Sequence, residues 1–186
     1  MAVIDKKSIP ELLTALKSKD DTERYGSFEV LLSISEEKPQ TLYPHWDFLA
    51  EMLDSQNAYW KLIAVRLLAN LTRADAENKF EKIFDKYYNL LNDSVVVAGH
   101  ITADSGRIAR AKPKLQAAIT DRLLNIDKTT QKHKDLVKSG AIESFSEYFA
   151  ESEDKEKIMK FVHQQLNGES PKTRKIAREF LAKWGN

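Results

Sequence analysis

Residues 170–185 read Ser-Pro-Lys-Thr-Arg-Lys-Ile-Ala-Arg-Glu-Phe-Leu-Ala-Lys-Trp-Gly. The hydroxyl of Ser170 can accept a hydrogen bond from the free N–H groups of a helix's first turn, so serine is a favoured cap. Pro171 follows at the first helical position, where its missing N–H has no partner to lose. Ala177, Phe180 and Leu181 stand seven, ten and eleven residues after the cap. The segment predicts a capped helix over residues 171–184.

Polar residues of the same capping kind recur along the chain. The predicted cap positions are 37, 36, 37 and 40 residues apart, and they are Asp20, Asn57, Asp93, Thr130 and Ser170. A helix pair that repeats about every 40 residues is typical of helical solenoids, because one pair cannot bury its apolar stripe alone and stacked pairs can. The spacing therefore predicts about five repeats.

Apolar residues recur at helical spacing on both sides of each predicted cap. Leu12, Leu13 and Leu16 form one such stripe, and spacings of three and four put apolar side chains on one helical face. We find no alternation of period two, so we expect no strands. Taking the first and then the second helix of each pair, we expect helices near residues 9–18 and 21–36, 41–54 and 57–73, 78–91 and 94–111, 113–125 and 131–150, and 154–167 and 171–184.

The predicted repeats share a register beyond the cap. Four residues after the cap stand Arg24, Lys61, Val97, Lys134 and Arg174, and three of the five repeats carry a small residue seven after it. A polar turn residue, then a cation, a small residue and a Leu at about these offsets resembles the HEAT-repeat family, most clearly in residues 57–71 and 173–185. Residues 94–112 depart from the pattern, which points to a register shift there.

The resemblance implies an all-α fold, a right-handed α-solenoid of about five HEAT-like hairpins, with armadillo-like stacking as a close relative. It implies a single repeat domain over residues 1–186 and carries little information about function. The expected repeats cover residues 9–37, 40–74, 78–111, 113–150 and 154–185.

Composition supports a helical protein. The 186 residues include only 6 Gly and 5 Pro, which fits long helices joined by short turns. No cysteine is present, so disulfides and thiolate metal sites are excluded. The N-terminal residues lack the apolar run of a signal peptide, and no stretch approaches the ~18 apolar residues of a membrane span. We therefore expect a cytoplasmic chain with no membrane partner.

No residue pattern indicates catalysis or a metal site. Ser105 follows Asp104 inside a predicted helix, without the strand-to-helix turn that a hydrolase nucleophile needs. The four histidines form no pair at metal-binding spacing on a helix, and they are His45, His100, His133 and His163. We expect a protein that is not an enzyme and that binds no metal and no cofactor.

The predicted helix over residues 94–111 carries two glycines. Gly99 and Gly106 are seven residues apart, and each glycine inside a helix costs about 1 kcal/mol relative to alanine. Two such residues favour close packing of this helix against a neighbour.

Charge is unevenly distributed along the chain. Residues 1–93 hold 12 Lys/Arg and 16 Asp/Glu, whereas residues 94–186 hold 17 and 12. Stacked repeats would set Lys134 and Lys138 beside Arg174 and Arg178, which have the same register. We predict a basic strip on the concave surface of the second helices; the structural alternative is that such cations tie repeats together through turn acids. The candidate residues are Lys61, Arg107, Arg110, Lys134, Lys138, Arg174 and Arg178.

Repeat architecture without catalytic residues favours a non-enzymatic protein–protein interaction scaffold that uses the concave second-helix surface. The basic tilt of the second half favours an acidic protein or peptide as the partner. A regulatory subunit of a larger complex would bind through the same kind of surface and would differ only in how permanent its partner is. The alternative is a nucleic-acid-binding module related to the HEAT-like DNA alkylation-repair glycosylases, with Trp60 as a stacking group and Asp104 beside Arg107 as the acidic candidate.

Overall fold

The computed structural model describes residues 7–185, and all of its regular elements are helices. The chain divides into two compact units, Met1–Phe80 and Glu81–Asn186. The boundary falls inside one helix, α6 (Lys79–Asn89). Each unit is described below by itself.

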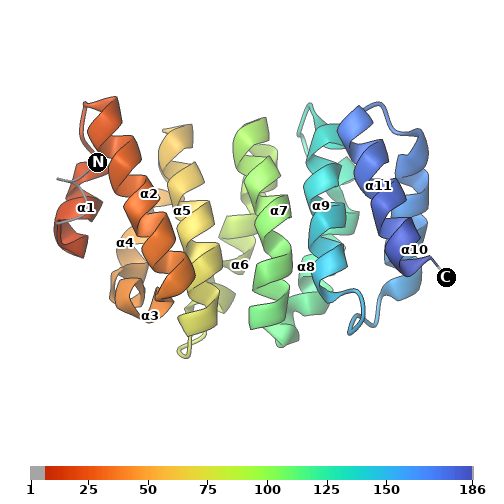
Figure 1. Cartoon of the computed structure of the whole chain (residues 1–186), viewed down its shortest axis with the longest axis horizontal. Helices are drawn as coiled ribbons and strands as arrows, with labels where there is room; N and C mark the ends of the chain where they lie inside the picture. The colour runs from red at the N-terminus through yellow and green to blue at the C-terminus, as the bar shows by residue number, and fades with distance from the viewer. Residues whose placement is uncertain (1–6, 186) are drawn as a thin grey trace. The chain divides into compact units, whose positions relative to one another are not determined.

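Unit 1 pairs shorter helices with two long ones. The long helices α2 and α5 pack against each other, α1 packs against α2, and α4 packs against α5 (Figure 1). The elements are α1 (Ile9–Ala15), α2 (Asp21–Glu37), α3 (Pro39–Leu42), η2 (Tyr43–His45), α4 (Trp46–Met52), α5 (Ala58–Leu71) and η3 (Thr72–Ala74).

Polar side chains join α2 to the end of α5. The amide of Asn70 donates a buried hydrogen bond of 2.7 Å to the hydroxyl of Ser35. The guanidinium of Arg73 donates to the carbonyl oxygens of Ser35 and Glu36 at 3.1 and 2.5 Å. Because the last carbonyls of a helix have no partner within it, Arg73 supplies the acceptors at the end of α2 with donors.

Unit 2 has the same alternation of shorter and longer helices. The long helices α7, α9 and α11 lie side by side, with α8 and α10 behind them (Figure 1). The elements after α6 are η4 (Leu90–Asn92), α7 (Val95–Ala111), η5 (Pro113–Leu115), α8 (Gln116–Leu124), η6 (Ile126–Lys128), α9 (Lys134–Tyr148), α10 (Lys155–Gln164), η7 (Gln165–Asn167) and α11 (Pro171–Trp184).

Hydroxyl pairs connect the long helices α7 and α9 to the helices α6 and α8 that pack behind them. The phenol of Tyr88 in α6 lies 3.0 Å from the Oγ of Ser105 in α7. The phenol of Tyr148 in α9 lies 2.9 Å from the Oγ1 of Thr120 in α8. Both phenols are buried, and burial raises the pKa of each above its ordinary value. These pairs satisfy polar groups that would otherwise be costly inside the core.

Three of the predicted caps are confirmed. Asp20 accepts from the N–H of Glu23, Asn57 from that of Tyr59, and Ser170 from that of Thr173. In each case the side-chain oxygen satisfies an N–H of the first turn, as the sequence predicted.

The other two predicted caps are wrong. The cap of α7 is Ser94 rather than Asp93, and its hydroxyl accepts from the N–H of Val97. The residue before α9 is His133, three positions after the predicted Thr130. Thr130 instead donates to the side-chain oxygen of Asn92, at the turn before α7. Because Thr130 bonds to Asn92 of another turn, it does not cap α9, and α9 begins at Lys134.

The all-helical prediction is confirmed for residues 7–185, where the structure contains no strand. The predicted helical segments correspond to helices of the structure within a few residues, apart from the late start of α9. The five-hairpin solenoid and the single domain stay predictions.

Candidate functional site

Arg24 and Arg174, which stand four residues after a cap, donate hydrogen bonds to the turn that precedes their own helix. Arg174 donates to the carbonyl oxygens of Gly168 and Glu169 at 2.7 and 2.8 Å. Arg24 donates in the same way to the carbonyl of Ser18 at 2.8 Å. The carbonyl lies two residues before the cap in both repeats, so the shared register has a structural use.

Lys138 is held inside unit 2 by two carboxylates. Its side chain is 8% exposed, and its Nζ lies 2.8 Å from Asp127 and 3.5 Å from Asp135. Lys134 donates to the carbonyl of Asp127 at 2.7 Å. The ammonium groups of Lys138 and Lys134 therefore both bond to acceptors within unit 2 and are not simple surface charges.

Asp135 connects the start of α9 to the turn before α11. Its carboxylate accepts the backbone N–H of Glu169 at 2.5 Å, and its carbonyl accepts from the hydroxyl of Thr173. The N–H of Glu169, reinforced by Lys138, holds the pKa of Asp135 below its ordinary value. These bonds join α9 to the turn before α11 through a carboxylate, a hydroxyl and backbone groups, so a role of the basic residues in tying repeats together stays a prediction.

The remaining candidate cations have different surroundings. Arg107 lies 3.6 Å from Asp104, and Arg110 lies 3.5 Å from Glu147 of the next helix. Arg178 is exposed on α11, and Lys61 is half-buried in α5 of unit 1. A binding strip made of all seven residues stays a prediction.

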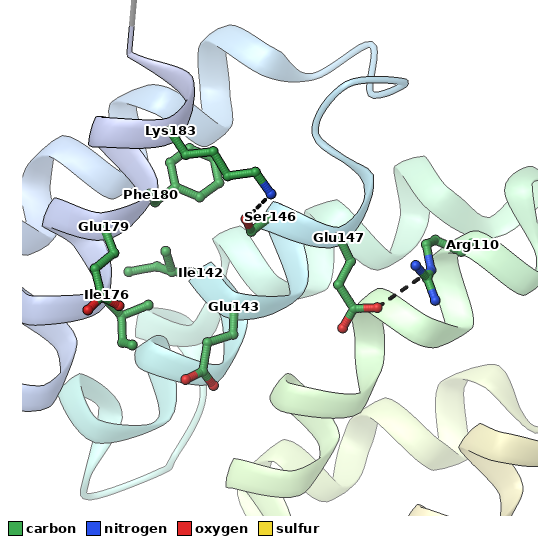
Figure 2. Close-up of a pocket in the computed structure, with 9 residues that line it drawn as sticks. All are labelled: Arg110, Ile142, Glu143, Ser146, Glu147, Ile176, Glu179, Phe180 and Lys183. Carbon is green, nitrogen blue, oxygen red and sulfur yellow. Dashed lines mark hydrogen bonds and ion pairs between the residues drawn. The ribbon is translucent and has the colours of Figure 1, made fainter. Parts of the chain in front are cut away.

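A groove of about 630 Å³ opens over the three long helices of unit 2 (Figure 2). It receives Arg110 from α7 and four residues from α9, and the remaining four come from α11. The lining residues are Arg110, Ile142, Glu143, Ser146, Glu147, Ile176, Glu179, Phe180 and Lys183.

The groove has an apolar floor. Ile142 is 0% exposed and Phe180 is 3% exposed, whereas Ile176 is half-buried. The Phe180 ring packs edge-on against Phe149 with centroids 5.1 Å apart, so the floor is anchored in the core. Ile176 is the floor residue that presents apolar surface to solvent.

The rim of the groove is charged and loosely paired. Glu147 contacts Arg110 at 3.5 Å, and Lys183 donates to Ser146 at 3.5 Å (Figure 2). Glu143 and Glu179 make ion pairs with lysines outside the groove at 3.9 and 3.7 Å. Ion pairs this long and this solvated contribute little, about 0–1 kcal/mol, so a ligand can exchange with them.

Of the seven candidate binding residues from the sequence, only Arg110 lines the groove. The groove combines side chains of three helices, and no single segment carries a motif for it. A weak signal was present in the spacing of Glu143 and Glu147, and of Ile176, Glu179 and Lys183, because offsets of three, four and seven share a helical face.

Ser105 and Asp104, which the sequence analysis considered for catalysis, make contacts with neighbouring groups of the fold. The hydroxyl of Ser105 donates to the carbonyl of Ile101 at 2.7 Å and lies against Tyr88. The side chain of Asp104 is 9% exposed and lies beside Arg107. Within residues 7–185, no group of three or more His, Asp or Glu side chains is arranged to hold a metal ion.

None of the described helices is long and apolar enough to cross a membrane. No protein-family model matches the sequence, and no curated protein matches it significantly.

Proposed function

We propose that this chain is a non-enzymatic protein-interaction module of the HEAT-like kind, and that the groove over α7, α9 and α11 receives a short segment of a partner protein. The observation that carries the proposal is the combination of an apolar floor with a loosely paired, charged rim on one face of the long helices. Helical repeat proteins use such continuous helical faces to bind extended partners.

The size of the groove suits a protein side chain. Its volume of about 630 Å³ lies within the ~300–1,000 Å³ range of ligand sites, which combine apolar walls with a few polar groups that fix orientation. One apolar anchor of the partner, such as Leu or Phe, would contact Ile176, the part-exposed residue of the floor. The rim would then position the residues on either side of the anchor.

The charge of the rim favours a basic partner segment. Three carboxylates, those of Glu143, Glu147 and Glu179, line the groove against two cations, Arg110 and Lys183. Lys172 and Lys175 pair with Glu143 and Glu179 from outside the groove and partly offset these charges. The carboxylates, however, line the groove and contact a bound segment directly, whereas the charge of the half-chain is screened beyond about 10 Å. We therefore propose Lys or Arg beside the apolar anchor, in place of the acidic partner that the overall charge tilt favoured.

Selection from a display library of random peptides tests the proposal. Peptides selected on the wild-type protein would be counter-selected against Ile176→Glu, which places a charge on the groove floor. We expect enriched peptides with an apolar anchor and a neighbouring Lys or Arg, and affinity about tenfold or more weaker for Ile176→Glu.

Val96→Glu is the matched control, because Val96 is a 54% exposed apolar residue of α7 outside the groove. It introduces the same charge and should leave peptide binding unchanged. A library that yields no peptide, or peptides that bind Ile176→Glu as well as wild type, would refute binding in the groove. Enriched acidic peptides would refute the proposed partner charge alone.

A further inference from the structure

Unit 1 contains a lysine ammonium placed over two aromatic rings. Lys17 follows the end of α1, and its Nζ lies 5.3 Å from the ring centroid of Phe48 and 5.9 Å from that of Trp60. Phe48 belongs to α4 and Trp60 to α5. Three segments that are separate in the sequence therefore build one cation-binding arrangement.

The rings, rather than a carboxylate, hold this ammonium. Within residues 7–185, Lys17 makes no ion pair within 4.0 Å, whereas Lys7 and Lys79 of the same unit contact Glu23 and Asp47 at 2.6 and 3.4 Å. A cation within about 6 Å of a ring centroid is attracted to the negative face of the ring, and Trp is the strongest of the aromatic acceptors. The arrangement thus selects for a cation without supplying a counter-charge.

The occupant can be displaced. Lys17 is exposed, while Phe48 and Trp60 are half-buried and keep part of their surface open to solvent. A primary ammonium is strongly hydrated and flexible, so an exposed one gains little from the rings. A methylated ammonium carries the same charge with fewer N–H groups to desolvate, and sites built from aromatic faces are the known solution for such groups.

We propose that Phe48 and Trp60 form a binding site for the trimethylammonium group of a methylated lysine in a partner protein, and that Lys17 occupies this site when no partner is bound. The resident side chain is itself a lysine, so the two rings already lie at cation–π distance from a lysine ammonium. The site lies in unit 1 and does not depend on the proposed groove in unit 2.

Titration with N-acetyl-trimethyllysine amide tests the proposal, with the indole N–H resonance of Trp60 as the readout in the full-length protein. We expect the resonance of Trp60 to shift while that of the buried Trp46 does not. Lys17→Ala removes the resident cation and should tighten binding by about two- to fivefold, the value of one exposed cation–π contact. Lys19→Ala removes the same charge two residues away and should leave the affinity at the wild-type value.

Further arms separate this site from other causes. The neutral analogue in which carbon replaces the quaternary nitrogen should not shift Trp60, and Phe48→Leu should weaken binding in a protein whose circular dichroism is unchanged. Phosphocholine probes a lipid headgroup as the source. Equal shifts with the neutral analogue, no gain in Lys17→Ala, or a stronger response to phosphocholine than to trimethyllysine would overturn the proposal.

Discussion

The hydroxyl of Ser144 in α9 bonds to two backbone groups of α7, those of Gly106 and Thr102. Its Oγ accepts from the N–H of Gly106 at 2.7 Å and donates to the carbonyl of Thr102 at 2.5 Å. These two backbone groups, four residues apart, would ordinarily bond to each other. A single side chain of the neighbouring helix therefore bonds to both a donor and an acceptor of the α7 backbone.

Ser144→Ala should destabilise the protein by about 1–3 kcal/mol, because it removes the bridging partner of two buried backbone groups. Chemical denaturation monitored by circular dichroism gives the change in unfolding free energy. Ser139→Ala is the control, since Ser139 is equally buried in α9 but its hydroxyl donates only to the carbonyl of Leu136 in its own helix. Equal effects of the two substitutions would show that the contact of the Ser144 hydroxyl with α7 has no special role.

The close packing that allows this contact was partly visible in the sequence. Gly106 was predicted to face a neighbouring helix, and a Cβ there would lie 2.8 Å from the carbonyl oxygen of Ser144. Gly99 was predicted to do the same, but a Cβ there meets nothing within 4 Å. Gly140, which the pattern did not single out, has tighter surroundings than either of these glycines. Spacing within one helix cannot reveal which glycine faces the partner, because this depends on the rotation of both helices.

Gly140→Ala and Gly99→Ala should therefore change stability in opposite directions. A Cβ at Gly140 would lie 2.5 Å from Thr102 Oγ1 and 2.9 Å from the backbone nitrogen of Ala103. We expect Gly140→Ala to destabilise by about 1–3 kcal/mol through overpacking, despite the better helix propensity of alanine. Gly99→Ala has open space and should stabilise by up to about 1 kcal/mol. Thermal unfolding of both variants beside wild type would decide, and a stabilised Gly140→Ala would contradict the close contact.

Asp135 should make part of the stability of unit 2 dependent on pH. The N–H of Glu169 and the ammonium of Lys138 lower the pKa of this carboxyl in the folded state. Its contribution is therefore fully present above the unfolded-state pKa of about 3.9, and it is lost as the pH falls through the lower folded-state pKa. Asp135→Asn removes the charge but keeps an acceptor oxygen.

We expect Asp135→Asn to be less stable than wild type by about 1–3 kcal/mol at neutral pH, with the difference shrinking below about pH 4. Urea denaturation at several pH values measures both quantities. Asp127→Asn is the comparison, because its carboxyl also contacts Lys138 but is 63% exposed. A difference between wild type and Asp135→Asn that stays constant down to pH 2 would show that the carboxylate is not the source.

The sequence predicted the helices and three caps because those features depend on neighbours a few residues away. Asp20, Asn57 and Ser170 act within their own first turns. The cap of α9 and the groove were not predictable in this way. Thr130 is diverted by Asn92, which lies 38 residues earlier, and the groove depends on which faces of α9 and α11 meet. The shared register of Arg24 and Arg174 was visible, but its role in closing turns required the geometry.

Duplex DNA provides the last test, since nucleic acid is the alternative partner. On the long helices of unit 2, Glu143 and Glu147 of α9 pair with Lys172 of α11 and Arg110 of α7, so cations of the outer helices are separated by carboxylates. Lys138 is buried as well. Repulsion of phosphates by these carboxylates should offset the attraction of the exposed cations. We therefore expect no more than weak binding of a labelled duplex in fluorescence anisotropy at low salt.

The salt dependence makes the result decisive, because each neutralised phosphate weakens binding by about 0.9 log units per log unit of salt. Glu143→Gln with Glu147→Gln should strengthen binding and steepen the slope, since it removes the separating charges without changing their shape. Arg178→Glu alone should change duplex binding and its salt slope little relative to wild type. Strong binding by wild type with a steep slope that Arg178→Glu reduces would instead support the nucleic-acid alternative and would justify an assay for release of alkylated bases.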